Sequence, residues 1–457
     1  MQFRSATIRV TLLTPVMLAA CTFSPLTDER IEYRPRTDAQ PVQYPQNGAQ
    51  PGPGESARVG AIVNGLALHQ AIALTLLHSP DLADFAYNVR AAEAHVLQAG
   101  LGPNPQVRTS IENLGGPDDA GNTFKRTTVV LSQVIELAGK RRKRLSLADS
   151  SQRLAMWDYE DQRLQVVTEV TRRYIAVVAA QLRVEQALRS TRTVEKMQTI
   201  VNQRAAAGVI PTSARDKALV RVSVEGIELD RLTQQLEAAR QTLAASWSGT
   251  TSDFGPADGT FPASTALPDK QVLLERARRH PRLARWADEY QHRQHALSLA
   301  QAYGVPDLSI GAGVRHFPNA DDTAALIQFT VPLALFDRNQ GHVLESRFKF
   351  AQADAQKKAA QADLQEEIAR AYADAHSAQY AIQTLDGETL SAARSAFESA
   401  QEAFRMGQTD YLSVLDAERT LVNIQRQRID ALELFHTSVT SLEGLSGTPL
   451  MNQPSVQ

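Results

Sequence analysis

The chain presents one order of landmarks twice, at an offset of about 200 residues. His78-Ser79-Pro80-Asp81-Leu82 returns as Arg279-His280-Pro281-Arg282-Leu283, and Trp247-Ser248-Gly249 returns as Leu445-Ser446-Gly447. Around these landmarks, each half has the pattern of a helix, two strands and two long helices. A tandem duplication of one structural unit is therefore the strongest constraint on the fold.

The duplication divides the 457 residues into two units and their connecting segments. We expect a signal peptide at 1–20, an extended segment at 21–60, a first unit at 61–250, a linker at 251–267, a second unit at 268–449 and a tail at 450–457. From Thr22 to about Gly60 the sequence is rich in Pro, Gln, Gly and Asp and has no apolar periodicity. That composition predicts an extended spacer without packed structure.

Each unit contains two runs with the two-residue period of a strand that has one apolar face. The expected strands are about 105–114 and 126–136 in the first unit, and about 306–317 and 323–334 in the second. Runs of about 9 to 11 residues can cross a bilayer as tilted strands. The alternative is two hairpins packed on a water-soluble core. The membrane interpretation is favoured because no other sheet-forming sequence is available to cover the apolar face.

Four strands are too few to enclose a pore. A barrel of about eight strands is the smallest that side chains fill well. Open sheet edges in lipid would leave unpaired backbone groups that cost several kcal/mol each. We therefore expect several copies of the chain to share one barrel.

Very long helices are predicted after each strand pair, at about 140–204 and 212–246 and again at about 339–406 and 410–445. Some 65 helical residues extend roughly 100 Å. Small apolar residues at three- and four-residue spacing favour coiled-coil packing, and the remaining positions are too polar for lipid. The predicted fold class is therefore mainly α with a small β part, with the helices in water below the strands.

Both helix pairs turn at a glycine. The first bend is Gly208-Val209-Ile210-Pro211-Thr212, and the second is Gly407-Gln408-Thr409-Asp410. Glycine permits the reversal, and proline ends the ladder of helical hydrogen bonds. Thr212 or Asp410 can cap the returning helix.

Composition excludes several classes of function. The chain has 48 Lys and Arg against 50 Asp and Glu, so it has no basic field for nucleic acid. One cysteine excludes an intramolecular disulfide and a multi-cysteine metal site. No phosphate-binding, nucleophile-elbow, zinc-protease or dinucleotide motif occurs, so we expect no enzyme activity and no cofactor. His292 and His295 have a spacing that can share a metal, but such histidines usually face solvent, and we assign no metal site.

The amino terminus has the pattern of an export signal that ends in a lipid attachment site. Arg4 and Arg9 precede a short apolar stretch. Leu18-Ala19-Ala20-Cys21 resembles the lipobox of bacterial lipoproteins, which predicts cleavage before Cys21 and its acylation. An ordinary signal peptide with an incidental cysteine is the alternative. Thr22 follows the cysteine where inner-membrane lipoproteins carry aspartate, which by this resemblance implies the outer membrane.

Two segments, together with the duplicated order of elements, resemble the TolC family of outer-membrane efflux ducts, in its lipoprotein form. They are residues 404–419, around Gly407, and residues 131–144, where the first unit leaves the strands. The resemblance implies a homotrimer with a twelve-stranded barrel and a periplasmic tunnel of twelve helices. It also implies two partners, a periplasmic membrane-fusion adaptor and an inner-membrane RND pump. The segments 135–141 and 337–341 resemble the heavy-metal (CzcC/CusC-like) branch.

The same resemblance implies roles for residues at the bends. Asp416 matches an aspartate that lines the periplasmic aperture, and Asp410 and Ser413 are further candidates. Ser413 replaces a second aspartate ring of some members, and Thr409 replaces a gating arginine. The adaptor contact candidates at the two tips are Gly208, Val209, Ile210, Pro211, Gly407, Gln408 and Thr409. Phe404 and Met406 are either further contacts or core residues.

The expected function is passive conduction of solutes, with heavy-metal cations as the expected cargo, across the outer membrane. A multidrug duct of the same fold is one alternative. A periplasmic lipoprotein scaffold or adaptor, without membrane strands, is an alternative of a different class.

Overall fold

The computed structural model describes residues 65–112, 126–249, 254–259, 261, 267–317 and 321–447. All of them belong to the second of two compact units, Gln40–Gln457. The expected signal peptide, Cys21, the spacer at 21–60 and the tail at 450–457 lie outside the described residues, as does most of the linker at 251–267.

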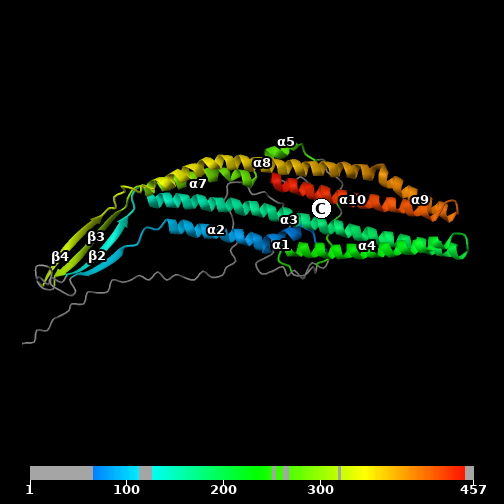
Figure 1. The fold of residues 1–457 in the computed structure, drawn as a ribbon, viewed down its shortest axis with the longest axis horizontal. Helices are drawn as coiled ribbons and strands as arrows, with labels where there is room; N and C mark the ends of the chain where they lie inside the picture. Colours follow the sequence, from blue (N-terminus) through cyan, green and yellow to red (C-terminus); the bar gives the residue numbers. More distant parts are fainter. Residues whose placement is uncertain are drawn as a thin grey trace, which may run out of the picture. The chain divides into compact units, whose positions relative to one another are not determined.

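In both halves short helices come first, followed by two strands and then by long helices (Figure 1). The first half contains α1 (Leu68–His78), α2 (Pro80–Ala99), β1 (Gln106–Glu112), β2 (Arg126–Ile135), α3 (Lys140–Ala206) and α4 (Thr212–Ala245). The second half contains α5 (Lys270–Ala277), α6 (Pro281–Ala284), α7 (Trp286–Tyr303), β3 (Leu308–Phe317), β4 (Asp322–Thr330), α8 (Gln340–Thr384), the π-helical turn η2 (Leu385–Thr389), α9 (Leu390–Arg405) and α10 (Tyr411–Ser446). The prediction of a mainly helical fold with a small sheet is confirmed.

The four strands form one antiparallel sheet in the order β1-β2-β3-β4. The central pair joins the two halves, with Val129 opposite Val314. On the same face Ile310 lies opposite Phe329, whose side chain is 67% exposed. The opposite face carries polar contacts, such as the ion pair of Arg126 with Glu112 at 3.5 Å. The sheet therefore has the apolar and the polar face that the alternation predicted, and much of the apolar face is uncovered.

Two elements differ from the expected ranges. The predicted strand at 323–334 ends at Thr330, and Pro332 soon after it has no N–H to donate to a sheet ladder. The predicted helix at about 339–406 is interrupted at Leu385–Thr389, where Gly387 has φ −67° and ψ −112°. This non-helical ψ explains why one long helix becomes α8, η2 and α9 (Figure 1).

Each half packs its long helices around its own apolar cluster. In the first half, residues of α1, α3 and α4 surround Val170 and Leu243. In the second half, residues of α5, α8 and α10 surround Ile368 and Leu442. In the part of the chain that the structure describes, no helix is both long and apolar enough to cross a membrane.

Ser79 and its counterpart His280 both cap the helix that follows them. The Ser79 hydroxyl accepts a hydrogen bond from the Leu82 amide at 3.4 Å, and His280 Nδ1 accepts one from the Arg282 amide at 3.2 Å. Burial lowers the pKa of His280 to about 4, against the opposing effect of Asp161. The imidazole is therefore neutral at pH 7 and can accept a hydrogen bond as a helix cap. The repeat thus conserves the capping function although the residue type differs.

Candidate functional site

The two helical bends have matching backbone geometry. Gly208 has φ +72° and Gly407 has φ +77°, in the left-handed region that favours glycine. After each glycine, the next amide bonds back to the carbonyl five residues earlier: Val209 to Arg204 at 3.0 Å, and Gln408 to Ala403 at 2.8 Å. The bends are thus two copies of one helix-ending motif.

A buried cluster holds the two bends together, and we name it the tip cluster. Its members are Met197, Val201, Ala218, Phe404, Tyr411, Val414 and Leu415. The Arg204 guanidinium donates a hydrogen bond to the Phe404 carbonyl and lies 4.8 Å from the centre of the Phe404 ring. The ends of α3 and α9 are therefore fixed to each other, on the side of the helices away from the sheet (Figure 1).

The predicted adaptor contacts lie mostly on the surface of the bends. Gly208, Val209, Pro211, Gly407 and Gln408 are exposed, whereas Ile210 and Thr409 are half-buried. Phe404 is part of the tip cluster, which confirms the core interpretation for this residue. Met406 is 63% exposed and is not a core residue. Side chains of both bends are thus accessible in the single chain.

Asp410 acts as the cap of α10. Its carboxylate accepts hydrogen bonds from the Ser413 amide at 3.0 Å and from the Ser413 hydroxyl at 2.8 Å. These bonds lower the pKa of Asp410, and the bond from the amide has the larger effect. The expectation that Thr212 caps α4 is wrong, because Pro211 occupies the cap position and Thr212 is the first helical residue.

Asp416 differs from the other two aperture candidates. Asp410 and Ser413 satisfy each other, whereas no hydrogen bond or ion pair to the Asp416 carboxylate is found within the described ranges. Asp416 is exposed, while Val414 and Leu415 beside it belong to the tip cluster. Asp416 therefore extends from the face of α10 that points away from this cluster.

Near the tip cluster lies a buried charged network that the sequence analysis missed. Glu418 is 5% exposed, and Arg221 binds both of its oxygens, with distances of 2.7 and 3.1 Å. Arg221 also pairs with Glu225 at 2.6 Å, and the Ser190 hydroxyl lies 3.4 Å from Glu418. Burial alone would lower the pKa of Arg221, but the two carboxylates outweigh it and raise the pKa.

This network joins helices of both halves. Ser190 belongs to α3, Arg221 to α4 and Glu418 to α10. A buried ion pair loses much of its favourable energy to desolvation, but removal of one partner leaves an uncompensated charge. Separation of α4 from α10 would leave the buried charge of Arg221 or of Glu418 without its partner. The network therefore holds these two helices together. The only signal for it in the sequence was an acidic residue, Glu418, next to the apolar positions of α10.

Replacement of Arg221 by Met should destabilise the chain by about 3–5 kcal/mol, because Glu225 and Glu418 remain buried without a cation. The double variant Arg221→Met/Glu418→Met should be more stable than Arg221→Met alone. Arg231→Met is the matched control, since Arg231 pairs with Glu228 on the exposed side of the same helix. Urea denaturation followed by circular dichroism measures all three. Equal losses for Arg221→Met and Arg231→Met would contradict the role of burial.

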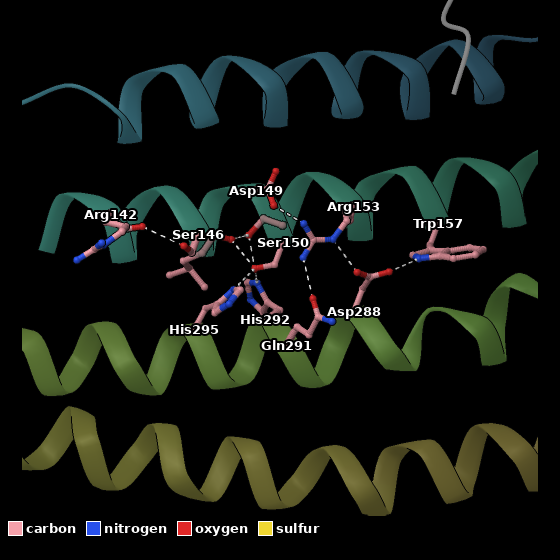
Figure 2. A network of polar contacts seen from close by, with 12 residues as sticks. Arg142, Ser146, Asp149, Ser150, Arg153, Trp157, Asp288, Gln291, His292 and His295 are labelled. Carbon is pink, nitrogen blue, oxygen red and sulfur yellow. Dashed lines mark hydrogen bonds and ion pairs between the residues drawn. The ribbon is translucent and has the colours of Figure 1, made fainter. Parts of the chain in front are cut away.

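The two histidines considered as metal ligands lie in a polar seam between α3 and α7 (Figure 2). His292 Nδ1 is 3.3 Å from the Ser150 hydroxyl, and His295 Nδ1 is 3.4 Å from the same oxygen. Both rings are half-buried, so the expectation that they face solvent is wrong. No cluster of three or more potential metal ligands is present in the described part of the chain.

The remainder of this seam consists of an ion pair with supporting hydrogen bonds. Asp288 accepts from Arg153 Nε at 2.6 Å and from Trp157 Nε1 at 2.8 Å, and Arg153 also donates to Gln291 at 3.1 Å (Figure 2). These contacts fix α7, the helix before β3, against α3. The seam therefore has a structural role.

Two known proteins with similar sequences are metal-resistance proteins. The chain is 28% identical to the cobalt-zinc-cadmium resistance protein CzcC of Cupriavidus metallidurans over 382 residues, which cover 84% of this chain and 90% of that protein. It is 27% identical to the nickel-cobalt-cadmium resistance protein NccC of Alcaligenes xylosoxydans xylosoxydans over 318 residues, which cover 63% and 64% of the two chains.

Solved structures with the same fold have lower sequence identity. One is CusC, whose structures were described for the conformational changes that accompany folding and transmembrane channel formation. It matches with a TM-score of 0.71 and 17% identity, and the match covers 85% of this chain and 93% of CusC. The outer membrane protein VceC of Vibrio cholerae has a TM-score of 0.70 at 19% identity and covers 84% and 97%.

A single family model accounts for both halves. It is described as outer membrane efflux protein, and it matches residues 71–249 and again residues 270–448. The two matches coincide with the duplication read from the sequence landmarks. Since together they span most of the chain, this protein belongs to the outer membrane efflux protein family.

Proposed function

We propose that this chain forms the outer-membrane duct of a tripartite efflux system and passively conducts heavy-metal cations. The observation that carries the proposal is the uncovered apolar face of a four-stranded sheet, whose outer strands have no further partner in the described ranges and which is joined directly to long polar helices. Lipid covers an apolar face of this kind, and water surrounds the helices.

The sheet also supports a homotrimer. In the described part of the chain, β1 and β4 each pair on one side only. An open edge within lipid is costly, because its backbone groups have no hydrogen-bond partner. Three copies supply twelve strands, enough for a closed barrel, and place three sets of long helices around one axis.

The proposed partners follow from the helical bends, and the proposed anchor follows from the amino-terminal segment. Exposed residues of the bends, with Val209 60% exposed, supply a surface for a periplasmic adaptor that connects the duct to an inner-membrane RND pump. We assign no catalytic residue and no cofactor to the duct, so the pump provides the energy. We also assign Cys21 as the acylated residue that attaches the mature chain to the outer membrane.

The cargo assignment rests on the metal-resistance names of CzcC and NccC. It is consistent with Asp416, because three copies of an exposed carboxylate around an axis produce a negative potential that favours cations. Ser413 contributes no charge, and Asp410 keeps its charge but is held in place as the cap of α10.

Deletion of the gene should make cells sensitive to cobalt, zinc and cadmium while their tolerance of common antibiotics stays the same. Growth assays across a panel of metals and antibiotics measure this, with the wild-type gene supplied in trans as the control. Sensitivity to antibiotics without sensitivity to metals would support the multidrug alternative and contradict the assigned cargo.

A charge on the apolar face should prevent membrane assembly. Phe329→Glu places a carboxylate toward lipid, whereas Gln328→Glu places the same group on the polar face of the same strand. We expect outer-membrane fractions to contain trimers of Gln328→Glu but few or none of Phe329→Glu, as measured by native gel electrophoresis. If both variants assemble equally, the strands do not lie in lipid, and the scaffold alternative gains support.

Asp416→Asn should reduce the preference of the channel for cations, because it removes the negative charge from each copy. Reversal potentials in planar bilayers under a salt gradient measure the preference. Asp363→Asn, an exposed carboxylate on α8, is the matched control and should leave the reversal potential as in the wild type. An unchanged reversal potential for Asp416→Asn would remove this residue from the aperture.

Metabolic labelling with palmitate should label the wild-type chain and fail to label Cys21→Ala, because the thiol is the attachment point. Thr22→Ala, with the neighbouring residue changed, should keep the label. Label that persists in Cys21→Ala would refute the anchor.

A further inference from the structure

The segments that connect the strands to the helices carry an excess of positive charge. The segments 136–144, 307 and 337–338 contain six basic and three acidic side chains, whereas the whole chain has a formal net charge of −2. Two of the cations are neutralised: Lys140 Nζ lies 2.7 Å from Asp307, and Arg144 binds the Glu136 carboxylate. The charge that remains is concentrated in four side chains.

Those four cations have no acidic partner among the residues that the structure describes. Arg141 Nε donates to the Gly100 carbonyl at 2.5 Å, and Arg338 Nε donates to the Ala334 carbonyl at 3.2 Å. Neither bond neutralises a charge, and Arg142 and Lys143 form no ion pair within the described ranges. Asp337, the exposed acid of these segments, accepts from the Asn339 amide at 2.8 Å and keeps its charge, so four unpaired cations face one unpaired carboxylate.

Large apolar side chains are exposed at the same level. They come from the segments that enter and leave the strands: Leu101, Leu137, Tyr303, Val305, Leu333, Leu335 and Phe336, the last 91% exposed. Contacts with the backbone place two of the cations beside these apolar residues. Arg141 donates to the carbonyl of Gly100, the residue before Leu101, and a Cβ added to Gly304, which lies between Tyr303 and Val305, would be 2.7 Å from the Arg338 carbonyl. We call these seven apolar residues and the four unpaired cations the junction belt.

The combination fits one type of surface. Apolar side chains next to unpaired Lys and Arg are found where a protein crosses from hydrocarbon into the headgroup layer, because the apolar parts enter lipid while the cations reach phosphates. The junction belt also continues the apolar face of the sheet, since Leu333 and Phe336 follow β4 and Leu137 follows β2. Its occupant must therefore be continuous with whatever covers the sheet.

We propose that the junction belt binds the phosphates of anionic phospholipids in the leaflet of the outer membrane that faces the periplasm. This inference rests on the proposed insertion of the sheet in the outer membrane, and it adds a lipid class that the duct selects. Each Lys or Arg near an anionic surface contributes about 1 kcal/mol, or roughly fivefold in lipid partitioning. Salt weakens this contribution because it screens the charges.

The test uses the full-length chain reconstituted in vesicles with equal amounts of phosphatidylglycerol and phosphatidylcholine. After extraction in mild detergent, mass spectrometry gives the ratio of the two lipids that remain bound. We expect phosphatidylglycerol to be enriched at 0.05 M NaCl, and the enrichment to decrease at 0.5 M NaCl. A bound ratio equal to that of the vesicles would overturn the proposal without any variant, and it would leave the duct function intact.

Arg141→Gln/Arg142→Gln/Lys143→Gln should lower the enrichment about fivefold or more. Arg192→Gln/Lys196→Gln/Arg215→Gln is the matched control, because it removes three exposed cations, also without ion pairs in the described ranges, from the end of α3 and the start of α4. The control should keep the enrichment of the wild type. Equal losses in both variants would show an effect of net charge alone and contradict the belt.

Two further arms separate other occupants from lipid. Inorganic phosphate, added at matched ionic strength, should leave the enrichment of phosphatidylglycerol unchanged. Loss of the enrichment in phosphate would indicate a site for free anions and contradict the lipid proposal. Both triple variants should form trimers in pure phosphatidylcholine. If only the belt variant fails to do so, the cations bind another copy of the chain, and the lipid proposal is wrong. Arg338→Gln, a smaller change, should lower the enrichment without loss of the trimer.

Discussion

Backbone hydrogen bonding at the edges of a four-stranded sheet is the constraint on which this protein depends. β2 and β3 are paired on both sides, whereas β1 and β4 each have one edge without a strand in the described chain. In water these edges could bond to solvent, but the apolar face, with Ile327 and Phe329, would be exposed. In lipid the face is covered, but the edges are not. The proposed closed ring of strands from several copies would satisfy both requirements.

The long helices connect the sheet to the tip cluster. Because the chain is duplicated, α3 with α4 and α8 with α10 form two similar packed pairs, each around its own apolar cluster. At the bends the pairs join through the tip cluster and through the buried pair of Arg221 and Glu418. One chain thus carries a membrane sheet and a tip whose two halves are locked together. The proposed ring of copies at the sheet would bring the same number of tips, and of exposed Asp416 carboxylates, around one axis.

Local signals in the sequence predicted the elements well. Alternation gave the strands of both units, and the lack of Pro and Gly gave the long helices. Gly208 and Gly407 marked bends whose positive φ angles only glycine adopts readily. The kink at Gly387 was missed, since an isolated glycine in a helical pattern does not reveal whether its ψ stays helical. The network around Glu418 was also missed, because it brings together residues about 200 positions apart that only the tertiary fold makes neighbours.

Amide hydrogen exchange of the assembled protein in lipid tests the central claim most directly. If neighbouring copies complete the ring, the edge strands β1 and β4 should be protected as strongly as the central strands β2 and β3, since every backbone N–H then has a strand partner. The protection of β1 and β4 should disappear when the assembly is dissociated in detergent. Fast exchange at β1 and β4 in the lipid-embedded particle, next to slow exchange at β2 and β3, would show open edges and contradict the account.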